Sequence, residues 1–295
     1  MAPTGRAARL PLRLKCENLQ VGGAFKIRGA FNMAAGLPED RRRAGLMTYS
    51  SGNHGLAIAL TARLLDVPAV VVMPTTAPAV KVEGARSLGA EVMFEGTTTI
   101  ERKARAEREA AARGMTIVPP FDHEQIIAGQ GTIGLEVLEQ CPDTGTVYVQ
   151  MSGGGLISGI ATALKRLRPE IRVVGVEPAG AARMTASLAA GHPVTIRSIE
   201  SIADGLLAVR PGDVTFRHIQ AFVDRVVTVE DPAIEESVRW LFTHAKLVAE
   251  PSGAITLAAI RADAEAGRLN LGAPVVAVIS GGNVEPSAFA KYLAG

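Results

Sequence analysis

Lys26 has the most unusual setting of any charged residue in this sequence. It lies in the segment Gly22-Gly23-Ala24-Phe25-Lys26-Ile27-Arg28-Gly29-Ala30, with glycines on both sides. Glycine lets a backbone approach a ligand closely or adopt a positive φ. A lysine that points inward at such a place loses hydration, and desolvation favours its neutral, nucleophilic amine. The segment therefore predicts an amine that attacks a carbonyl group.

Polar, glycine-rich turns follow predicted strands further along the chain. They are Ser51-Gly52-Asn53-His54, Ser152-Gly153-Gly154-Gly155 and Ser280-Gly281-Gly282-Asn283. The second turn leads from a strand into a helix, so successive N–H groups and a helix N-terminus form a site suited to phosphate. It has neither the Lys-Ser/Thr pair of a Walker A loop nor the GxGxxG pattern of a dinucleotide site. With Lys26, these turns predict an anionic cofactor that carries a carbonyl group.

Each turn also has a purely structural explanation. The turn at 152–155 is compatible with a tight strand-to-helix connection that binds nothing, and the one at 280–283 with an ordinary loop. Serine and asparagine at 50–53 are common helix N-caps. His54 taken alone is compatible with a structural histidine and is not identified as a general base. The turns carry weight because they occur together in one chain.

Short β-branched runs alternate with helical patterns, which predicts α/β units with parallel sheets, flanking helices and right-handed crossovers. We expect a small domain at 45–121 and a large domain formed by 1–44 and 122–295, with the active site at the carboxyl ends of the strands. The region 183–210 shows a helical piece and a loop without a clear pattern. The expected strands are 45–50, 69–73, 91–94, 115–118, 146–151, 171–176, 223–229 and 274–279, and the expected helices are 54–65, 78–88, 98–113, 128–140, 156–167, 232–245 and 253–267.

Composition excludes several classes of protein. A formal charge of +2 is too small to indicate a nucleic-acid surface. Cys16 and Cys141 are the only cysteines and lack metal-ligand neighbours, which indicates a reducing compartment. We find no apolar run of the roughly 18 residues that a membrane span needs and no signal-peptide core. The sequence therefore predicts a cytoplasmic protein without nucleic-acid or membrane partners.

The ordered set of motifs resembles one family, the fold-type II pyridoxal-phosphate enzymes, and within it the threonine/serine dehydratase and serine racemase group. The similarity extends from about Leu14 to the C-terminus. The motifs that carry it are 23–30 (GAFKIRGA), 50–54 (SSGNH), 128–132 (AGQGT), 152–156 (SGGGL), 202–205 (IADG) and 280–283 (SGGN).

The resemblance implies a two-domain fold like that of the tryptophan synthase β-subunit, pyridoxal 5'-phosphate as cofactor and a homodimer. Lys26 matches the lysine that bonds covalently to the cofactor, and Asn53 the residue that contacts its ring hydroxyl. Ser280 matches the hydroxyl partner of the pyridine nitrogen. Ser51, Asn53 and His54 lie in the loop that receives the substrate carboxylate. The phosphate loop is matched by Ser152, in place of the usual first glycine, and by Gly153, Gly154 and Gly155.

The implied reaction is the conversion of L-threonine, L-serine or a close β-hydroxy amino acid to a 2-oxo acid and ammonia. Lys26 would serve as the base for the α-proton. A serine at 280 supplies no carboxylate charge to the pyridine nitrogen, which favours loss of the β-hydroxyl over transamination. Three alternatives remain open: a serine racemase that uses Lys26 and Ser51, a catalytically weak cofactor-binding protein, and a nucleotide-binding α/β protein. Ser51 could also simply bind the carboxylate.

The sequence departs from the family pattern at three places. Many members bind Mg²⁺ or Ca²⁺ through a Glu, a carbonyl and an Asp; Glu177 and Ala181 match the first two, but Arg183 replaces the Asp. An Arg183–Glu177 ion pair could replace the cation, so we expect no tightly held metal. Fewer residues than usual precede Lys26, so Pro3 to Leu14 is either a remnant of the usual N-terminal segment or the result of a late start. No isoleucine-feedback domain is expected after Asn283.

Overall fold

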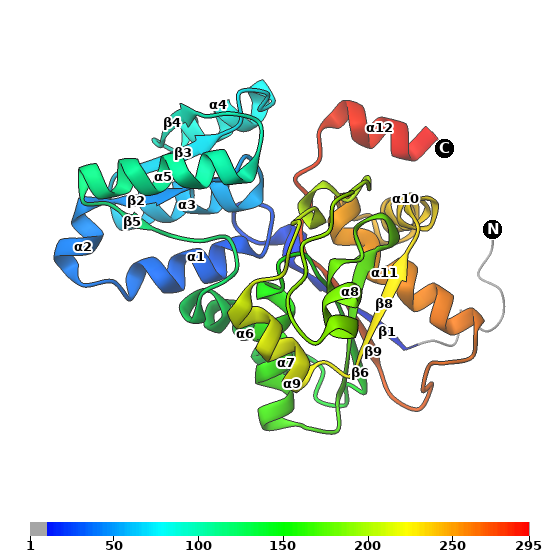
Figure 1. The fold of residues 1–295 in the computed structure, drawn as a ribbon. Helices are drawn as coiled ribbons and strands as arrows, with labels where there is room; N and C mark the ends of the chain where they lie inside the picture. Colours follow the sequence, from blue (N-terminus) through cyan, green and yellow to red (C-terminus); the bar gives the residue numbers. More distant parts are fainter. Residues whose placement is uncertain (1–10, 295) are drawn as a thin grey trace. The chain divides into compact units, whose positions relative to one another are not determined.

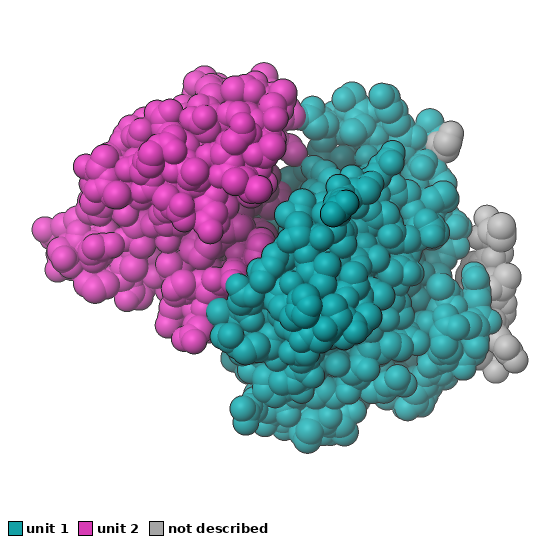
Figure 2. Space-filling model, viewed as in Figure 1, with its two compact units in different colours: residues 1–24, 130–295 teal, residues 25–129 magenta. Residues whose placement is uncertain are grey.

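The computed structural model describes residues 11–294, and the contacts within the chain group it into two compact units. Unit 2 is the continuous stretch from Phe25 to Gly129. Unit 1 combines the chain up to Ala24 with the chain from Gln130 onward (Figure 2). The boundary on the C-terminal side falls inside helix α6, Glu124–Gln140.

Unit 2 contains a four-stranded parallel sheet in the order β4-β3-β2-β5 (Figure 1). The strands are β2 Leu46–Thr48, β3 Ala69–Met73, β4 Glu91–Phe94 and β5 Thr116–Ile117. The helices are α1 Lys26–Ala35, α2 Glu39–Ala44, α3 Asn53–Leu65, α4 Ala79–Ser87 and α5 Thr99–Arg113. Every residue of β3 is buried, because helices cover both faces of this sheet.

The alternation of side chains along β3 explains the two cores of unit 2. Val71 and Met73 lie in one apolar cluster with residues of α1, α3 and α4. Val70 and Val72 lie in another, with Ala106 of α5 among its members. Successive residues of a strand point to opposite faces, so one short apolar run supports helices on both sides.

Unit 1 contains a five-stranded parallel sheet in the order β1-β9-β6-β7-β8. The strands are β1 Leu12–Cys16, β6 Thr146–Gln150, β7 Arg172–Pro178, β8 Arg225–Val229 and β9 Val275–Ile279. The helices are α7 Gly155–Leu167, α8 Arg183–Ala190, α9 Asp213–Phe222, α10 Asp231–Trp240, a π-helical turn Leu241–Ala245, α11 Pro251–Glu265 and α12 Pro286–Ala294. Short 3-10 turns occur at Glu17–Leu19, Ala179–Ala181 and Asp204–Leu206.

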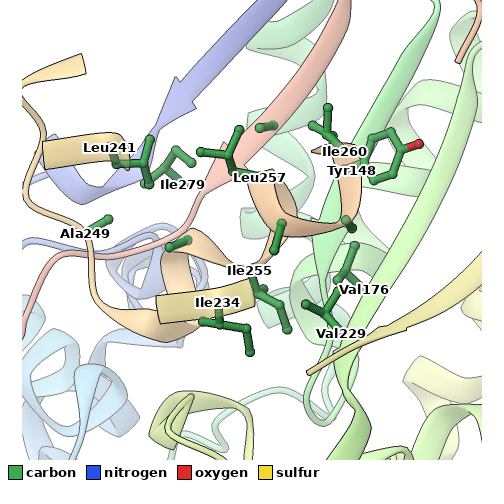
Figure 3. Packing of buried hydrophobic residues seen from close by; sticks show 14 of the residues in the cluster. Tyr148, Val176, Val229, Ile234, Leu241, Ala249, Ile255, Leu257, Ile260 and Ile279 are labelled. Atoms are coloured by element: carbon green, nitrogen blue, oxygen red, sulfur yellow. The ribbon is translucent and has the colours of Figure 1, made fainter. Parts of the chain in front are cut away.

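Helix α11 forms the centre of the unit 1 core. Its residues from Pro251 to Ile260 are all buried, as expected for a helix that is apolar on every side. Figure 3 shows Ile255, Leu257 and Ile260 of this helix in the same cluster as Ile279 of β9. The sheet and this helix therefore fix the ends of β6 and β9, where the polar turns begin.

The predicted α/β architecture with parallel sheets agrees with the structure. Unit 2 extends beyond the predicted small domain 45–121 on both sides, because Ala30 and Met33 of α1 and Ile126 of α6 belong to its core. The sequence did not predict β1, α1, α2, α9 or α12. Of the Pro3–Leu14 segment, residues 3–10 lie outside the described residues. No helix within residues 11–294 is long and apolar enough to cross a membrane.

Candidate active site

Lys26 is the first residue of α1 in unit 2. Its Nζ donates a hydrogen bond to the carbonyl oxygen of Pro120 at 2.7 Å and lies 5.1 Å from the centre of the Phe25 ring. Burial of the amine lowers the pKa of Lys26 to about 8. The positive end of the α1 dipole acts in the same direction. At neutral pH a larger fraction of this amine is neutral than of an ordinary lysine, which suits it to attack a carbonyl.

The segment that carries Pro120 is held by two buried side chains. The carbonyl of Val118 accepts hydrogen bonds from Thr48 Oγ1 and from His54 Nε2, both at 2.9 Å. Burial and the charge of Lys26 lower the pKa of His54 to about 3, although its bond to Val118 acts in the opposite direction. His54 is therefore neutral at physiological pH, with its proton on Nε2. His54 helps to position the segment whose Pro120 carbonyl accepts the bond from Lys26. Its contact with a substrate carboxylate stays a prediction.

The turn at Ser50 leads into the N-terminus of α3 without a side-chain cap. Gly52 is the N-cap residue and provides no side-chain cap, so neither a serine nor an asparagine occupies the N-cap position of α3. Ser50 Oγ instead accepts the N–H of Gly52 at 3.2 Å. Ser51 forms no side-chain hydrogen bond with any residue in the described part of the chain. The positive end of a helix suits a carboxylate, and Ser51 and Asn53 lie at the N-terminus of α3.

The glycine loop of unit 1 joins β6 to α7 in a conformation that requires glycine. Gly154 has a φ of +103°, and a Cβ atom there would lie 2.9 Å from atoms of Thr215 and Ile219. Within residues 11–294, no acceptor bonds to the N–H groups of Gly153, Gly154 or Gly155. These groups stand at the N-terminus of a helix of 13 residues. They form a cradle whose geometry suits a phosphate group, and the binding of phosphate there stays a prediction.

The glycine loop is tied to the segment that precedes and begins α9. The carbonyl of Gly153 accepts bonds from Gly212 N at 3.1 Å and from Thr215 Oγ1 at 2.6 Å. Ser152 Oγ accepts the N–H of Ala208 at 3.2 Å. The sequence did not identify Thr215, because its helix follows a region without a readable pattern.

Ser280 follows β9 directly, as predicted, and is 4% exposed. Its hydroxyl bonds to no residue in the described part of the chain. The next residues bind the segment before Lys26: Gly281 pairs with Ala24, and Gly282 N donates to Gly23 O at 2.9 Å. The turn after β9 therefore fixes the backbone two residues before the lysine.

Two further motifs serve helix packing. A Cβ at Gly129 would lie 2.6 Å from the carbonyl oxygen of Arg28, and one at Gly131 would lie 3.2 Å from that of Gly159. These glycines of α6 permit close approach of a neighbouring helix in each unit. Gly205 donates its N–H to Ser252 Oγ at 2.9 Å. None of these residues contributes a group that we assign to ligand binding.

The expected Arg183–Glu177 ion pair is not formed. Both residues are fully buried, but Glu177 accepts bonds from Met184 N, Thr185 N and Thr185 Oγ1. The carboxylate is thus occupied by the first turn of α8, and Arg183 bonds to main-chain carbonyls instead. Within residues 11–294 no three His, Cys, Asp or Glu side chains gather in a metal-binding group. The prediction of no tightly held metal stays a prediction.

Unit 2 has a half-buried lysine whose pKa is lowered, and unit 1 has a glycine loop whose N–H groups suit a phosphate. Each feature is typical of enzymes that bind a phosphorylated carbonyl cofactor. The sequence matches the family described as pyridoxal-phosphate dependent enzyme over residues 2–281. It is 42% identical over 273 residues to the L-threonine ammonia-lyase of Thermotoga maritima, covering 92% of this chain and 67% of the relative. It is 41% identical over 276 residues to a serine racemase of Oryza sativa subsp. indica, with 93% and 81% covered.

A solved structure gives the same result. The processed form of threonine deaminase isoform 2 from Solanum lycopersicum matches with a TM-score of 0.93 and 36% identity, covering 97% of this chain and 84% of that one. The chain therefore belongs to the pyridoxal-phosphate dependent enzymes, with the fold-type II architecture. This confirms the family, the fold and the cofactor that the motifs predicted.

The described residues fit the cofactor. The unbonded N–H groups at Gly153–Gly155 suit its phosphate, and the hydroxyl of Ser280, which bonds to no residue within 11–294, suits a ring nitrogen. Unit 2 brings together Lys26, Pro120 and His54, and unit 1 brings the turn after β9 to Ala24. The sequence missed Pro120 as the partner of Lys26, although Pro119-Pro120 marks the end of the first strand–helix series.

Proposed function

We propose that this protein is a pyridoxal-phosphate dependent ammonia-lyase. It converts L-threonine, L-serine or a close β-hydroxy amino acid to the 2-oxo acid and ammonia. Water is lost from the substrate and a second water releases the ammonia, so the net products are one oxo acid and one ammonia. The observation that carries the proposal is Lys26, whose buried amine has a pKa of about 8 in a chain 42% identical to an L-threonine ammonia-lyase.

Lys26 would have two tasks. When bound, pyridoxal phosphate supplies an aldehyde for amines and an aromatic ring that withdraws electrons from the substrate Cα. Lys26 Nζ holds the cofactor before substrate arrives. Displaced by the substrate's amino group, the neutral amine of Lys26 would be the base that takes the proton from Cα. A pKa near 8 keeps enough neutral amine for both tasks at physiological pH.

The N-terminus of α3 would orient the substrate. Its uncapped N–H groups and the Ser51 hydroxyl supply donors for the carboxylate. Asn53 lies in the first turn and would contact the ring hydroxyl of the cofactor. Fixing the carboxylate fixes which bond at Cα faces the base, and such orientation supplies much of the rate enhancement.

Ser280 would set the charge on the cofactor ring. Its hydroxyl is neutral, so it forms a hydrogen bond with the ring nitrogen without holding that nitrogen protonated. The substrate Cα then keeps more negative charge next to the β-carbon. This favours departure of the β-hydroxyl over transamination.

The direct test is release of 2-oxo acid from a panel of β-hydroxy amino acids by the cofactor-loaded enzyme. We expect turnover of L-threonine or L-serine and its loss in Lys26→Ala. Retention of bound cofactor without oxo acid from any member of the panel would overturn the proposal. It would then favour a catalytically weak cofactor-binding protein.

Ser51 supports a second candidate function, an amino-acid racemase. Reprotonation on the opposite face of Cα needs a second group besides Lys26, and the Ser51 hydroxyl has no partner within residues 11–294. The similarity to the rice serine racemase, 41%, equals that to the ammonia-lyase within a percent. Chiral chromatography after incubation with L-serine separates the two. D-serine without pyruvate, abolished by Ser51→Ala, would establish the racemase.

We propose a cytoplasmic homodimer that binds a small amino acid. The two unpaired cysteines support a reducing compartment, and the dimer follows from the family resemblance. Light scattering of the loaded enzyme tests the dimer, and a monomeric mass would contradict it.

A further inference from the structure

Arg183 carries a fully buried positive charge that bonds to no carboxylate within residues 11–294. It is the first residue of α8 and is 0% exposed. Its Nη1 and Nη2 donate to the carbonyl oxygen of Leu206 at 2.7 and 2.6 Å, and Nη2 also reaches that of Met151 at 3.5 Å. Its Nε has no partner. Removal of a guanidinium from water is costly, and main-chain carbonyls offset only part of that cost.

The setting of Arg183 is unfavourable for stability in a second way. A cation at the first position of a helix lies at the positive end of the helix dipole. Burial lowers the pKa of Arg183 to about 10, while the charge of Glu177 acts in the opposite direction. The guanidinium is therefore charged at neutral pH. A residue that folding alone does not favour at this place calls for another function.

The two carbonyls that Arg183 binds belong to the two segments that form the phosphate cradle. Met151 directly precedes the loop Ser152–Gly155. From Leu206 the chain continues to Ala208, Gly212 and Thr215, which bond to Ser152 and Gly153 from the other side. Arg183 thus joins the start of the loop to the start of the segment that supports it.

We propose that Arg183 is a positioning residue for the cofactor phosphate. Its planar fork holds Met151 and Leu206 together, so that the N–H groups of Gly153–Gly155 stay directed at one anion. It also places a fixed positive charge beneath the cradle, which favours an anion there. The inference rests on the assignment of this loop to the phosphate and is independent of the reaction catalysed.

The test compares pyridoxal phosphate with pyridoxal, which lacks the phosphate, on the apoenzyme of Arg183→Met. Methionine removes the charge and the fork but retains an apolar side chain. It leaves the carbonyl of Leu206 without these donors, so the melting temperature of the variant is measured first to show that it is folded. We expect binding of pyridoxal phosphate to weaken about 10- to 100-fold, as for loss of one charge-assisted hydrogen bond. Binding of pyridoxal should change little. Inorganic phosphate should raise the melting temperature of the wild-type apoenzyme and not that of the variant.

Arg225→Met is the matched control. Arg225 bonds to the buried Asp263 from the first residue of β8, at the amino end of the sheet and opposite to the glycine loop. Its replacement disrupts a partly buried charge contact without touching the cradle, so the preference for pyridoxal phosphate over pyridoxal should remain.

A second variant guards against loss of folding. Arg183→Lys keeps the charge but not the fork, and we expect an intermediate loss of phosphate preference. Equal weakening of both ligands, or no weakening of either, in a folded variant at position 183 would overturn the inference. Wild-type enzyme that binds pyridoxal phosphate but releases no oxo acid would contradict the proposed reaction and leave the role of Arg183 intact.

Discussion

The lysine region of unit 2 and the glycine loop of unit 1 differ in the groups that they offer a ligand: side chains in the first and backbone N–H groups in the second. Around Lys26 the chemistry depends on side chains whose pKa values burial has lowered, those of Lys26 and His54. In the glycine loop it depends on backbone N–H groups, and the loop is held through its Gly153 carbonyl, which accepts bonds from Thr215 Oγ1 and Gly212 N. The first region should therefore respond to pH and to the loss of a functional group. The second should respond to substitutions that add a side chain to a loop glycine or remove a residue that holds the loop in place.

Loss of the Lys26 amine is the change with the largest expected effect. In Lys26→Ala both attachment of the cofactor and proton transfer from Cα are lost, so we expect kcat to fall roughly 10³-fold or more. Binding of the phosphate by the glycine loop should persist, measured as retained affinity for a phosphorylated analogue without an aldehyde. Lys15→Ala is the control, because Lys15 is also partly buried and bonds to Gln140 at 3.2 Å in unit 1. Activity within a few-fold of wild type in Lys26→Ala would refute the assignment.

Gly154→Ala tests the loop by adding one carbon. The new Cβ would meet Thr215 and Ile219 at 2.9 Å in a backbone conformation that disfavours alanine by about 1–2 kcal/mol. We expect the cofactor dissociation constant to rise roughly 100-fold. In Gly191→Ala, φ is +75° but nothing lies within 4 Å of the added Cβ, so the backbone strain is matched and the cradle is untouched. An equal effect of the two substitutions on cofactor affinity would show that strain alone matters.

The pH dependence of cofactor attachment tests the lowered pKa of Lys26. Only the neutral amine attacks, so the association rate should rise about tenfold per pH unit below pH 8 and level off above it. The reaction rate of the free cofactor with a small amine, measured at the same pH values, corrects for protonation of the cofactor itself. A rate that still rises steeply beyond pH 9 would show a lysine with an ordinary pKa.

His54 gives a smaller effect, on stability. Its pKa is about 3 in the folded protein against an ordinary value of 6.5, so between these values only the unfolded chain binds the proton. The free energy of unfolding therefore falls as the pH falls through this window, by about 1.4 kcal/mol per pH unit. His54→Gln keeps a donor for Val118 and should remove this slope. The exposed His192→Gln is the control, and an unchanged slope in His54→Gln would show that His54 titrates normally.

The sequence predicted most strands and helices with a regular pattern of apolar residues. It predicted fewer of the elements whose place depends on contacts with residues far away in the chain. The buried strand β3 and the half-exposed strand β4 both match their predicted bounds, because turn residues mark the two ends of each strand in the sequence. Strand β1 mixes Arg13 and Lys15 with leucines at a sheet edge and was missed. Residues 26–35 were assigned to the large domain with the rest of 1–44, whereas the packing of α1 on α3 places them in unit 2.

The candidate site shows the same division. Lys26, the glycine loop and Ser280 stand out through residue type and order. The bond from Lys26 to Pro120 and that from Thr215 to Gly153 join residues far apart in sequence, so no local sequence pattern predicts them. The prediction of an ion pair between Arg183 and Glu177 was wrong because it, too, took no account of competing backbone groups. Charge and proximity suggest such a pair, but the N–H groups of α8 occupy the carboxylate.

The most direct measurement is borohydride reduction of the cofactor-loaded enzyme, followed by peptide mass spectrometry. The account predicts a single peptide with a stable pyridoxyl adduct, and the adduct should be on Lys26. An unmodified Lys26, or an adduct on another lysine, would contradict it.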